Sequence, residues 1–262
     1  MSDGVILIDK SPGETSHDVV AGLRRSLGVR RVGHAGTLDP FATGRLLVLV
    51  GRATRVQRFL MALPKVYEVT ARFGATSTTG DPEGEISETG RIPALDHLPT
   101  GRIRQRPPAY SAVKVDGERA YRRARRGEAV QLPEREVTVH RFERTGESTF
   151  TIECSAGTYV RSLIAGLGDA YCEALRRTRI GPFAVADADP GRILPIDDAL
   201  GFLPARDLVA DEARRAAHGV AVADEAAAQG AAVVRLRDAE GLIALAEPRE
   251  GGLLKPIVGF RA

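Results

Sequence analysis

The segment of the sequence with the clearest potential for chemistry is the loop Gly33-His-Ala-Gly-Thr-Leu-Asp-Pro-Phe-Ala-Thr-Gly44. One proline restricts its backbone and three glycines allow the tight turns of an ordered loop, and it presents one carboxylate, Asp39, and one imidazole, His34. A carboxylate can act as a covalent catalyst that divides one difficult step into two easier ones. An Asp-Pro pair alone is usually an ordinary turn. The loop by itself therefore leaves both a catalytic and a structural role open for Asp39.

Several other chemistries have no motif in this sequence. The chain has no GxxxxGK[ST] phosphate loop, no GxGxxG and no HExxH, and its five histidines lie far apart without metal-ligand spacing. A nucleotide-driven or metal-driven enzyme is therefore disfavoured, and we expect no cofactor and no metal.

Basic residues are unevenly distributed along the chain. Four of the 37 basic residues are lysines, so 33 are arginines, while the formal net charge is only +3. Codon bias explains much of an arginine excess, but the clustering favours phosphate recognition, because guanidinium groups form planar, always-charged forks. Composition alone leaves nucleic-acid binding at even odds. The clusters are Arg24, Arg25, Arg30 and Arg31; Arg102, Arg104 and Arg106; Arg119 to Arg126; and Arg176, Arg177 and Arg179.

Alternating and helical hydrophobic patterns predict the elements around the loop. Ser16 is expected to cap a helix through Leu27, and residues 30–45 are expected to form an ordered loop. The other expected elements of this part are strands at 4–9, 46–50 and 67–73 and a helix at 52–61.

The second half of the chain is expected to hold an arginine-rich insertion and a further domain. The insertion covers about 101–130 and ends in a short basic helix, and a domain boundary near 196 separates residues 1–195 from 196–262. We expect strands at about 135–144 and 148–155, a helix after Thr158, an Ala-rich helix at about 205–217, and strands at 232–236, 242–246 and 256–260.

Apolar runs such as Leu46–Val50 are much shorter than the ~20 residues of a membrane span, so no membrane association is expected. The N-terminus lacks the features of a secretory signal. The two cysteines, Cys154 and Cys172, form no disulfide framework, which favours a cytoplasmic location.

The Asp39 loop and five further segments, in order along the chain, resemble one family. The Gly33–Gly44 loop closely resembles the signature of the TruB family of tRNA pseudouridine synthases, in which this aspartate is the nucleophile. Further matches are Gly4–Lys10 with Thr15–Asp18, Lys65-Val-Tyr67, Pro107–Lys114, Cys154–Leu163, and Leu175–Arg177 with Gly181–Phe183.

The resemblance implies an α+β fold, the pseudouridine synthase fold: a mixed, mostly antiparallel sheet flanked by helices, with a small C-terminal β-rich, PUA-like domain. It also implies a reaction, in which a uridine at position 55 of the tRNA T-loop is cut at N1, turned and rejoined through C5. The partner would be the T-arm stem-loop of tRNA, with no protein partner implied and a monomer expected. Asp39 would form an adduct with ribose C1′ or with base C6, and the sequence does not choose between them.

The resemblance also assigns roles to individual residues. Arg161 would pair with Asp39, and Tyr67 would stack on the extracted uracil, although helix arginines are commonly solvated and the periodicity around Tyr67 favours a core aromatic. His34 would take the place of the flipped base, which costs roughly a few kcal/mol to extract. The remaining candidates are Tyr159, Leu175 and Lys10 for substrate binding, and Arg55, Arg123, Arg126 and Arg177 for the RNA backbone.

The sequence departs from the family pattern at Ser11, at Arg55, and in a segment before Leu175 that is about five residues shorter than usual. A different interpretation is a tRNA-binding and refolding protein without essential catalysis, which would share the basic clusters but has no evident need for Asp39, Tyr67 and Arg161. A carboxylate-based glycosidase is disfavoured, because such enzymes pair two carboxylates and the 33–44 loop offers one.

Overall fold

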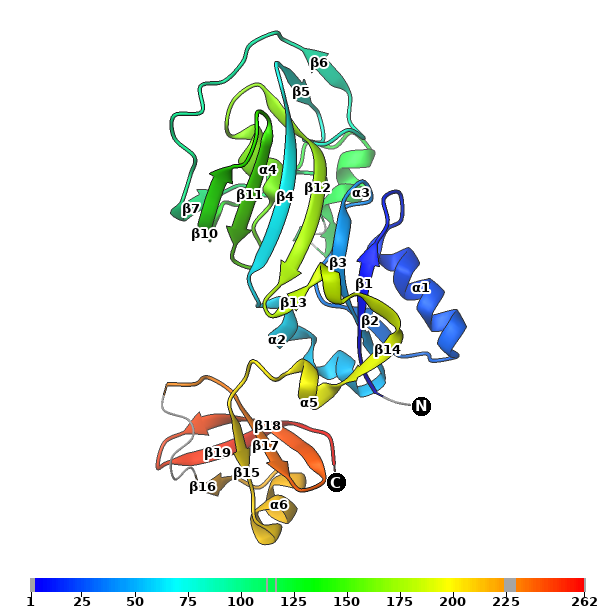
Figure 1. Ribbon diagram of the computed structural model, residues 1–262, viewed down its shortest axis with the longest axis vertical. Coiled ribbons are helices and arrows are strands. Elements are labelled where there is room, and N and C mark those ends of the chain that lie inside the picture. The colour runs from blue at the N-terminus through cyan, green and yellow to red at the C-terminus, as the bar shows by residue number, and fades with distance from the viewer. Residues whose placement is uncertain (1–2, 112, 116, 224–229, 262) are drawn as a thin grey trace.

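Two sheets organise the computed structural model, which describes residues 3–111, 113–115, 117–223 and 230–261 (Figure 1). The elements of its first half are β1 (Gly4–Lys10), α1 (Ser16–Leu27), β2 (Val32–His34), β3 (Thr43–Val50), the 3-10 helix η1 (Gly51–Val56), α2 (Gln57–Met61), β4 (Lys65–Phe73), β5 (Ala75–Ser77), β6 (Ile86–Glu88), β7 (Gly101–Gln105), β8 (Lys114–Val115), β9 (Glu118–Arg119) and α3 (Ala120–Arg125).

The second half continues the larger sheet and then forms the smaller one. Its elements are β10 (Arg135–Arg144), β11 (Thr149–Cys154), α4 (Val160–Ala165), β12 (Ala170–Ile180), β13 (Phe183–Ala184), the 3-10 helix η2 (Val185–Asp187), β14 (Asp189–Pro195), α5 (Ile196–Ala199), β15 (Ala205–Asp207), α6 (Ala210–Ala217), β16 (Val222–Ala223), β17 (Val234–Asp238), β18 (Gly241–Arg249) and β19 (Leu253–Gly259).

The larger sheet has ten strands in the described part of the chain, along the path β14-β1-β3-β12-β4-β11-β10-β7, with β2 paired to β3 and β13 to β12. Every pairing on this path is antiparallel except a short parallel one between β3 and β12. This topology confirms the expected α+β class with a mixed, mostly antiparallel sheet.

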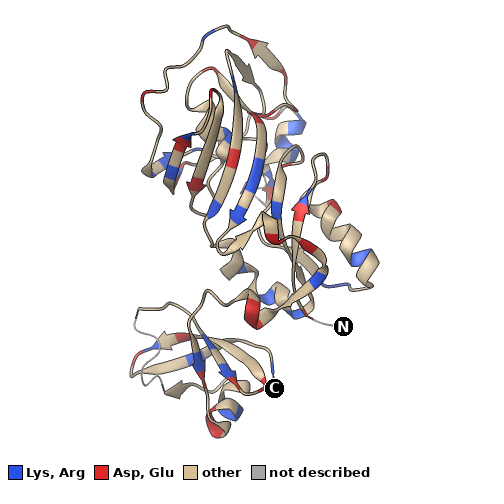
Figure 2. Ribbon diagram, in the orientation of Figure 1, with Lys and Arg blue, Asp and Glu red and all other residues tan. Residues whose placement is uncertain are grey.

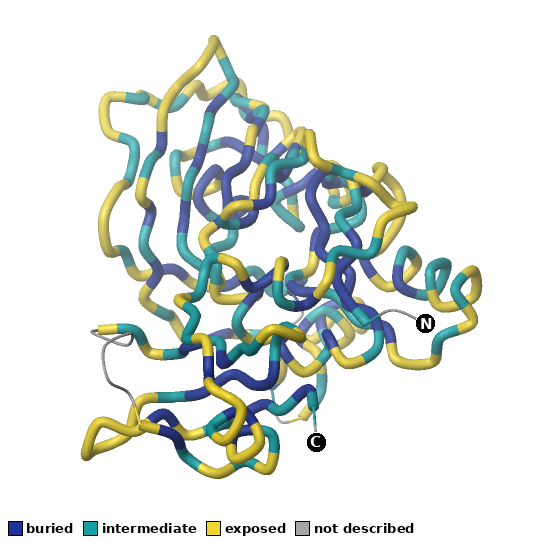
Figure 3. Tube along the Cα trace, turned by 60° about the horizontal axis from the view of Figure 1, so that its bottom comes forward, coloured by how far each residue is buried: buried dark blue, intermediate teal, exposed yellow. Residues whose placement is uncertain are grey.

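Alternation along β4 shows how the sequence assigns the faces of this sheet. Tyr67, Val69 and Ala71 are buried, whereas Glu68 and Arg72 between them are exposed. Since successive side chains on a strand point to opposite faces, one face packs on a core and the other meets solvent. The core on the packed face includes Val160, Leu163 and Ile164 of α4. Figure 3 shows the buried central strands surrounded by exposed loops.

Helix α1 packs against β1 and β3, and its first turn differs from the expectation. Thr15, not Ser16, is the cap: its side chain accepts a hydrogen bond from the Asp18 backbone N–H, and the Asp18 carboxylate accepts one from the Thr15 N–H. Ser16 is buried in the first turn, and its hydroxyl bonds the backbone of Leu38. The wrong cap assignment therefore concealed a contact to the Asp39 loop.

The smaller sheet has the order β15-β17-β18-β19-β16 and lies below η1, α2 and α5 in Figure 1. Its Leu245, Val258 and Phe260 share a hydrophobic cluster with Leu60 and Leu200 of the larger part. The compact β-rich C-terminal part agrees with the expected PUA-like domain.

Other expected elements needed correction. Residues 30–45 are not all loop, because β2 and the start of β3 lie within them, and the helix expected at 52–61 is η1 followed by α2. The insertion begins with β7, which pairs with β10 at the edge of the larger sheet. The Ala-rich helix covers only α6, because residues 205–207 pair with β17. The errors at 30–45, at the start of the insertion and at 205–207 have one cause: strand pairing overrode the local pattern.

Candidate active site

Buried polar side chains hold the backbone of the loop that carries Asp39. The Lys10 ammonium and the Arg177 guanidinium are both 1% exposed, and the Ser16 hydroxyl is buried beside them. Together they bond carbonyls of the loop and its neighbours, so the loop backbone is fixed by polar groups that have no access to solvent. The acceptors are the carbonyls of Ser11, Glu14 and Pro40 for Lys10 (2.8, 2.8 and 3.2 Å), of Gly36, Thr37 and Arg45 for Arg177 (3.1, 3.3 and 2.8 Å), and of Leu38 for Ser16 (3.3 Å).

The end of the loop requires a glycine for a physical reason. Gly44 has φ +105°, and a Cβ placed there would lie 2.3 Å from the carbonyl oxygen of Arg177. Only glycine accepts that conformation and that close approach without strain. The Gly44 backbone pairs with Arg177 at the short parallel junction of β3 and β12, so this residue joins the loop to the strand that carries Leu175.

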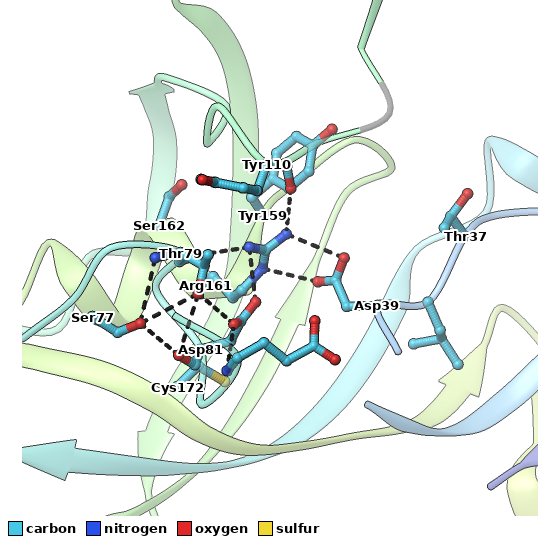
Figure 4. Close-up of polar contacts among 12 residues, drawn as sticks. Thr37, Asp39, Ser77, Thr79, Asp81, Tyr110, Tyr159, Arg161, Ser162 and Cys172 are labelled. Atoms are coloured by element: carbon cyan, nitrogen blue, oxygen red, sulfur yellow. Dashed lines mark hydrogen bonds and ion pairs between the residues drawn. The ribbon is translucent and has the colours of Figure 1, made fainter. Parts of the chain in front are cut away.

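Asp39 forms a two-pronged ion pair with Arg161 of α4. Arg161 Nε lies 2.9 Å from Oδ2 and Nη2 lies 3.1 Å from Oδ1 (Figure 4). The Arg161 side chain is 3% exposed, whereas that of Asp39 is 31% exposed. The fork geometry orients the carboxylate and favours its charged form, and the exposure leaves it open to a substrate.

The remaining donors of Arg161 are also occupied. Nη1 donates to the Thr79 carbonyl at 2.7 Å and pairs with Asp81 at 3.0 Å, and Nη2 donates to the Tyr110 carbonyl at 2.8 Å. All five N–H groups of the guanidinium therefore have partners. Arg161 is fixed by three separate segments before any substrate arrives.

Asp81 is the functional residue that the sequence interpretation missed. Its carboxylate is 4% exposed and accepts hydrogen bonds from the Thr79 hydroxyl (2.5 Å) and the Glu83 backbone N–H (3.1 Å). The available signal was the polar run Ser77-Thr-Thr-Gly-Asp81, which has no hydrophobic periodicity. Asp81 is a second carboxylate near Asp39, but it is buried and already bound to Arg161, Thr79 and Glu83, so it is not open to a substrate and does not support the glycosidase interpretation.

Electrostatics at the site work in opposing directions. Burial raises the pKa of the Asp39 carboxyl, the negative charge of Asp81 raises it further, and the Arg161 ion pair acts against both. Burial also lowers the pKa of the Lys10 ammonium. Among the described residues, no group of three or more His, Cys, Asp or Glu side chains is arranged to hold a metal ion.

Tyr67 and Leu175 lie on the same buried face beside the loop. Each is 7% exposed, and both belong to the hydrophobic cluster that contains Leu38. Burial raises the pKa of the Tyr67 hydroxyl, so this phenol stays protonated over the ordinary pH range. Leu175 is opposite Val69 in the register of β12 and β4, so the short segment before it does not remove it from this face.

Tyr159 immediately precedes α4, and His34 is the last residue of β2. Tyr159 exchanges two backbone hydrogen bonds with the Gln105 side chain, at 2.7 and 2.9 Å, and Arg135 stacks on its ring at 4.8 Å. The His34 ring packs edge-on against His17 with 5.9 Å between centroids, and its buried Nδ1 has no hydrogen-bond partner in the described residues. Burial lowers the pKa of His34, which favours a neutral ring that can stack on RNA bases.

Burial corrects two of the predicted RNA contacts. Arg177 was predicted to bind the RNA backbone, but its buried guanidinium is occupied by carbonyls of the loop. Lys10 was predicted to bind substrate, but all three of its ammonium donors bond carbonyls. The guanidinium of Arg55 donates to the carbonyl of Gly259 at 2.6 Å, which ties η1 to the smaller sheet. Arg123 and Arg126 lie on or beside α3 with acidic partners.

Comparisons with known proteins show the family of this chain. Residues 24–160 match the family model described as TruB family pseudouridylate synthase (N terminal domain). The chain is 46% identical to the tRNA pseudouridine synthase B of Thermobifida fusca, and the alignment covers 99% of both chains. It is 41% identical to the protein of the same name from Synechococcus sp. (strain WH7803), over 99% of this chain and 98% of the relative.

Solved structures give the same fold. A chain of a Cbf5-Nop10-Gar1 complex superposes with a TM-score of 0.69 and 26% identity, covering 99% of this chain and 84% of that chain. The site and the fold together define a pseudouridine synthase, an enzyme that isomerises uridine in RNA. The chain belongs to the TruB family.

Proposed function

We propose that this enzyme converts uridine 55 in the T-loop of tRNA into pseudouridine with Asp39 as the nucleophile. The single observation that carries the proposal is the pair of Asp39 and Arg161, in which the arginine is buried and the carboxylate stays 31% exposed. The relatives named tRNA pseudouridine synthase B support tRNA as the substrate.

The reaction needs no atoms beyond those of the nucleotide. In one route an Asp39 oxygen bonds to ribose C1′ as the N1–C1′ bond breaks, the uracil turns, and C5 then bonds to C1′ as the aspartate leaves. In the other route the oxygen adds to base C6 across the C5=C6 double bond, the N1–C1′ bond breaks, the uracil turns and C5 bonds to C1′. The aspartate then leaves C6 as the C5 proton is lost and the C5=C6 double bond forms again. Both routes remove one proton from C5 and place one on N1, so the product is an isomer and no redox cofactor is required.

The neighbouring side chains would hold the base while it turns. Tyr67 and Leu175 offer an apolar wall beside Asp39, and Tyr159 adds an aromatic ring close to Arg161 (Figure 4). Because burial keeps the Tyr67 hydroxyl protonated, we assign the Tyr67 ring a role in stacking on the uracil and do not assign Tyr67 a role as general base. The neutral ring of His34 would fill the space left by the flipped base.

The wider assignment concerns the whole chain. Residues 1–195 would form the catalytic domain and residues 196–262 the PUA-like domain, acting as a monomer in the cytoplasm. Two buried free cysteines, Cys154 and Cys172, suit a reducing compartment. Every helix in the described part of the chain is too short or too polar to span a membrane.

The decisive experiment measures tritium release from unmodified tRNA labelled at uracil C5, with wild type and Asp39→Asn. Loss of the nucleophile should reduce the single-turnover rate by about 10⁴-fold or more, while tRNA affinity stays within about tenfold. A variant that still releases tritium at a rate near wild type would remove Asp39 from its role. No release by wild type, with tight tRNA binding, would favour an RNA-refolding protein instead.

A further inference from the structure

The proposed reaction leaves one basic surface without a role. From Val19 to Leu38 the sequence holds four arginines and no acidic residue. These arginines form what we term the α1 patch: Arg24 and Arg25 in the last turn of α1, and Arg30 and Arg31 in the connection to β2. All four residues are exposed. Figure 2 shows the basic segments at the lower end of α1 and an acidic segment at its opposite end.

The α1 patch differs from the other exposed arginine clusters because its charge is not neutralised. None of its four side chains forms an ion pair with an acidic residue within the described parts of the chain. Arg24 donates to the carbonyl of Val32 at 3.0 Å, which braces the helix end against β2. The helix dipole stabilises positive charge near a helix C-terminus, but this explains only the placement of Arg24 and Arg25. Arg30 and Arg31 lie beyond the left-handed cap residue Gly28.

The position of the α1 patch relates it to the reactive loop. Helix α1 begins at Ser16, whose hydroxyl bonds Leu38 next to Asp39, and its 12 residues span about 18 Å. At the far end, the carbonyl of Arg31 accepts a hydrogen bond from Gly51 of η1 at 2.7 Å. Residues of η1 also hold the smaller sheet, through Arg55 and Gly259. The patch therefore lies one helix length from the catalytic carboxylate, on the side of the molecule where the smaller sheet is attached.

We propose that the α1 patch is a second RNA-binding site that holds the phosphate backbone of a duplex outside the loop containing the target uridine. A loop bound at Asp39 must continue into a stem, and exposed guanidinium forks without acidic partners match phosphate oxygens. The inference rests on the proposed T-loop substrate for its geometry, but not on the proposed nucleophile.

The test compares RNAs of different extent in an Asp39→Asn background, so that turnover does not enter. The patch variant is Arg25→Gln, Arg30→Gln and Arg31→Gln, which leaves the brace of Arg24 in place. The control variant removes three ion-paired arginines that lie elsewhere, Arg72, Arg91 and Arg179, each by substitution with Gln. Binding is measured across a salt series with full-length tRNA and with a hairpin cut to the T-loop and its closing base pairs.

The patch variant should bind full-length tRNA about tenfold more weakly at low salt and with a shallower salt dependence, because lost phosphate contacts release fewer counterions. Its affinity for the short hairpin should equal that of the parent. The control variant should bind both RNAs like the parent. Equal weakening on both RNAs, or unchanged binding of tRNA, would overturn the proposal. Failure of the parent protein to bind the hairpin would count against the T-loop assignment, and the tRNA salt slope would still decide the role of the patch.

Discussion

Two groups of arginines look alike in the sequence but have different surroundings in the structure. Arg161 and Arg177 are almost fully buried and have their guanidinium donors directed at carboxylates and carbonyls of the Asp39 loop. Five arginines of the insertion, all exposed except the half-buried Arg123, lie beside glutamates. Those pairs are Arg102–Glu136, Arg104–Glu134, Arg106–Glu134, Arg123–Glu128, and Arg126 with Glu118 and Glu128.

Because the two groups of arginines differ in burial, they have different roles. A buried guanidinium cannot lose one partner without leaving an uncompensated polar group, so it fixes geometry. An exposed ion pair contributes about 0–1 kcal/mol and exchanges its partner easily. Arg161 and Arg177 therefore form the frame of the active site, while the insertion arginines form a surface on which phosphates have to compete with glutamates.

The largest effect is expected from Arg161→Lys, which keeps the charge but removes the fork. An ammonium has three donors and no planar geometry, so it cannot hold Asp39, Asp81 and two carbonyls together. The rate of tritium release should fall about 100-fold or more. As a control, Arg176→Lys alters an exposed ion pair with Asp9 on the same sheet and should keep the wild-type rate within about twofold. Equal rates for Arg161→Lys and Arg176→Lys would contradict the distinction between buried arginines that fix the active site and arginines in exposed ion pairs.

Arg177→Gln should affect stability more than RNA binding. The substitution leaves buried carbonyls without donors, at about 1–3 kcal/mol for each unsatisfied group. The free energy of unfolding in urea should therefore fall by about 3 kcal/mol or more. Arg179→Gln, two positions along the same strand in an exposed pair with Glu153, should change it by less than about 0.5 kcal/mol. A reduced salt slope for tRNA binding with unchanged stability would instead make Arg177 an RNA contact.

A smaller effect on rate, with a distinctive pH signature, is expected from Asp81→Asn. In the proposed mechanism ionised Asp39 is the reactive form, so activity should fall as the pH drops through the pKa of Asp39. The charge of Asp81 helps to raise that pKa, and the neutral amide should lower it and move the acid limb of kcat/KM to lower pH. Loosening of Arg161 should also reduce the rate by roughly tenfold.

The matched control for this change is Glu85→Gln, an exposed carboxylate in the same segment, which should leave the acid limb in place. Titration of the RNA itself affects all three proteins alike, so the comparison between them isolates Asp39. An acid limb that stays in place or moves to higher pH in Asp81→Asn would contradict the electrostatic account.

The sequence predicted the residues that touch each other but not how each is supported. The pairing of Asp39 with Arg161 was implied by the family resemblance, and the apolar surroundings of Tyr67 were indicated by the periodicity of its strand. Asp81 could not be found this way, because its partner lies 80 positions along the chain and a turn-rich segment carries no periodic signal. The same limit concealed β7 and β15, whose pairing partners are distant in sequence.

Burial was the second quantity that residue types could not provide. Arg177 and Lys10 have the charge of RNA contacts and the surroundings of core residues, because several strands and the Asp39 loop close over them. A basic residue in a sequence motif is equally consistent with binding a ligand and with holding the backbone of a loop. Only the count of carbonyls within reach of its donors separates the two, and that count requires the fold.

The smallest effect on tRNA binding is expected for the arginines of the insertion. Arg123→Gln with Arg126→Gln should weaken tRNA binding only a few-fold and reduce the salt slope slightly, because glutamates already compensate these charges. Removing the partners instead, with Glu118→Gln and Glu128→Gln, should tighten binding and steepen the slope, since the same arginines then meet phosphate without competition. If both double variants bind like wild type across the salt series, α3 lies outside the RNA interface. The arginines of the insertion would then only form ion pairs with neighbouring glutamates.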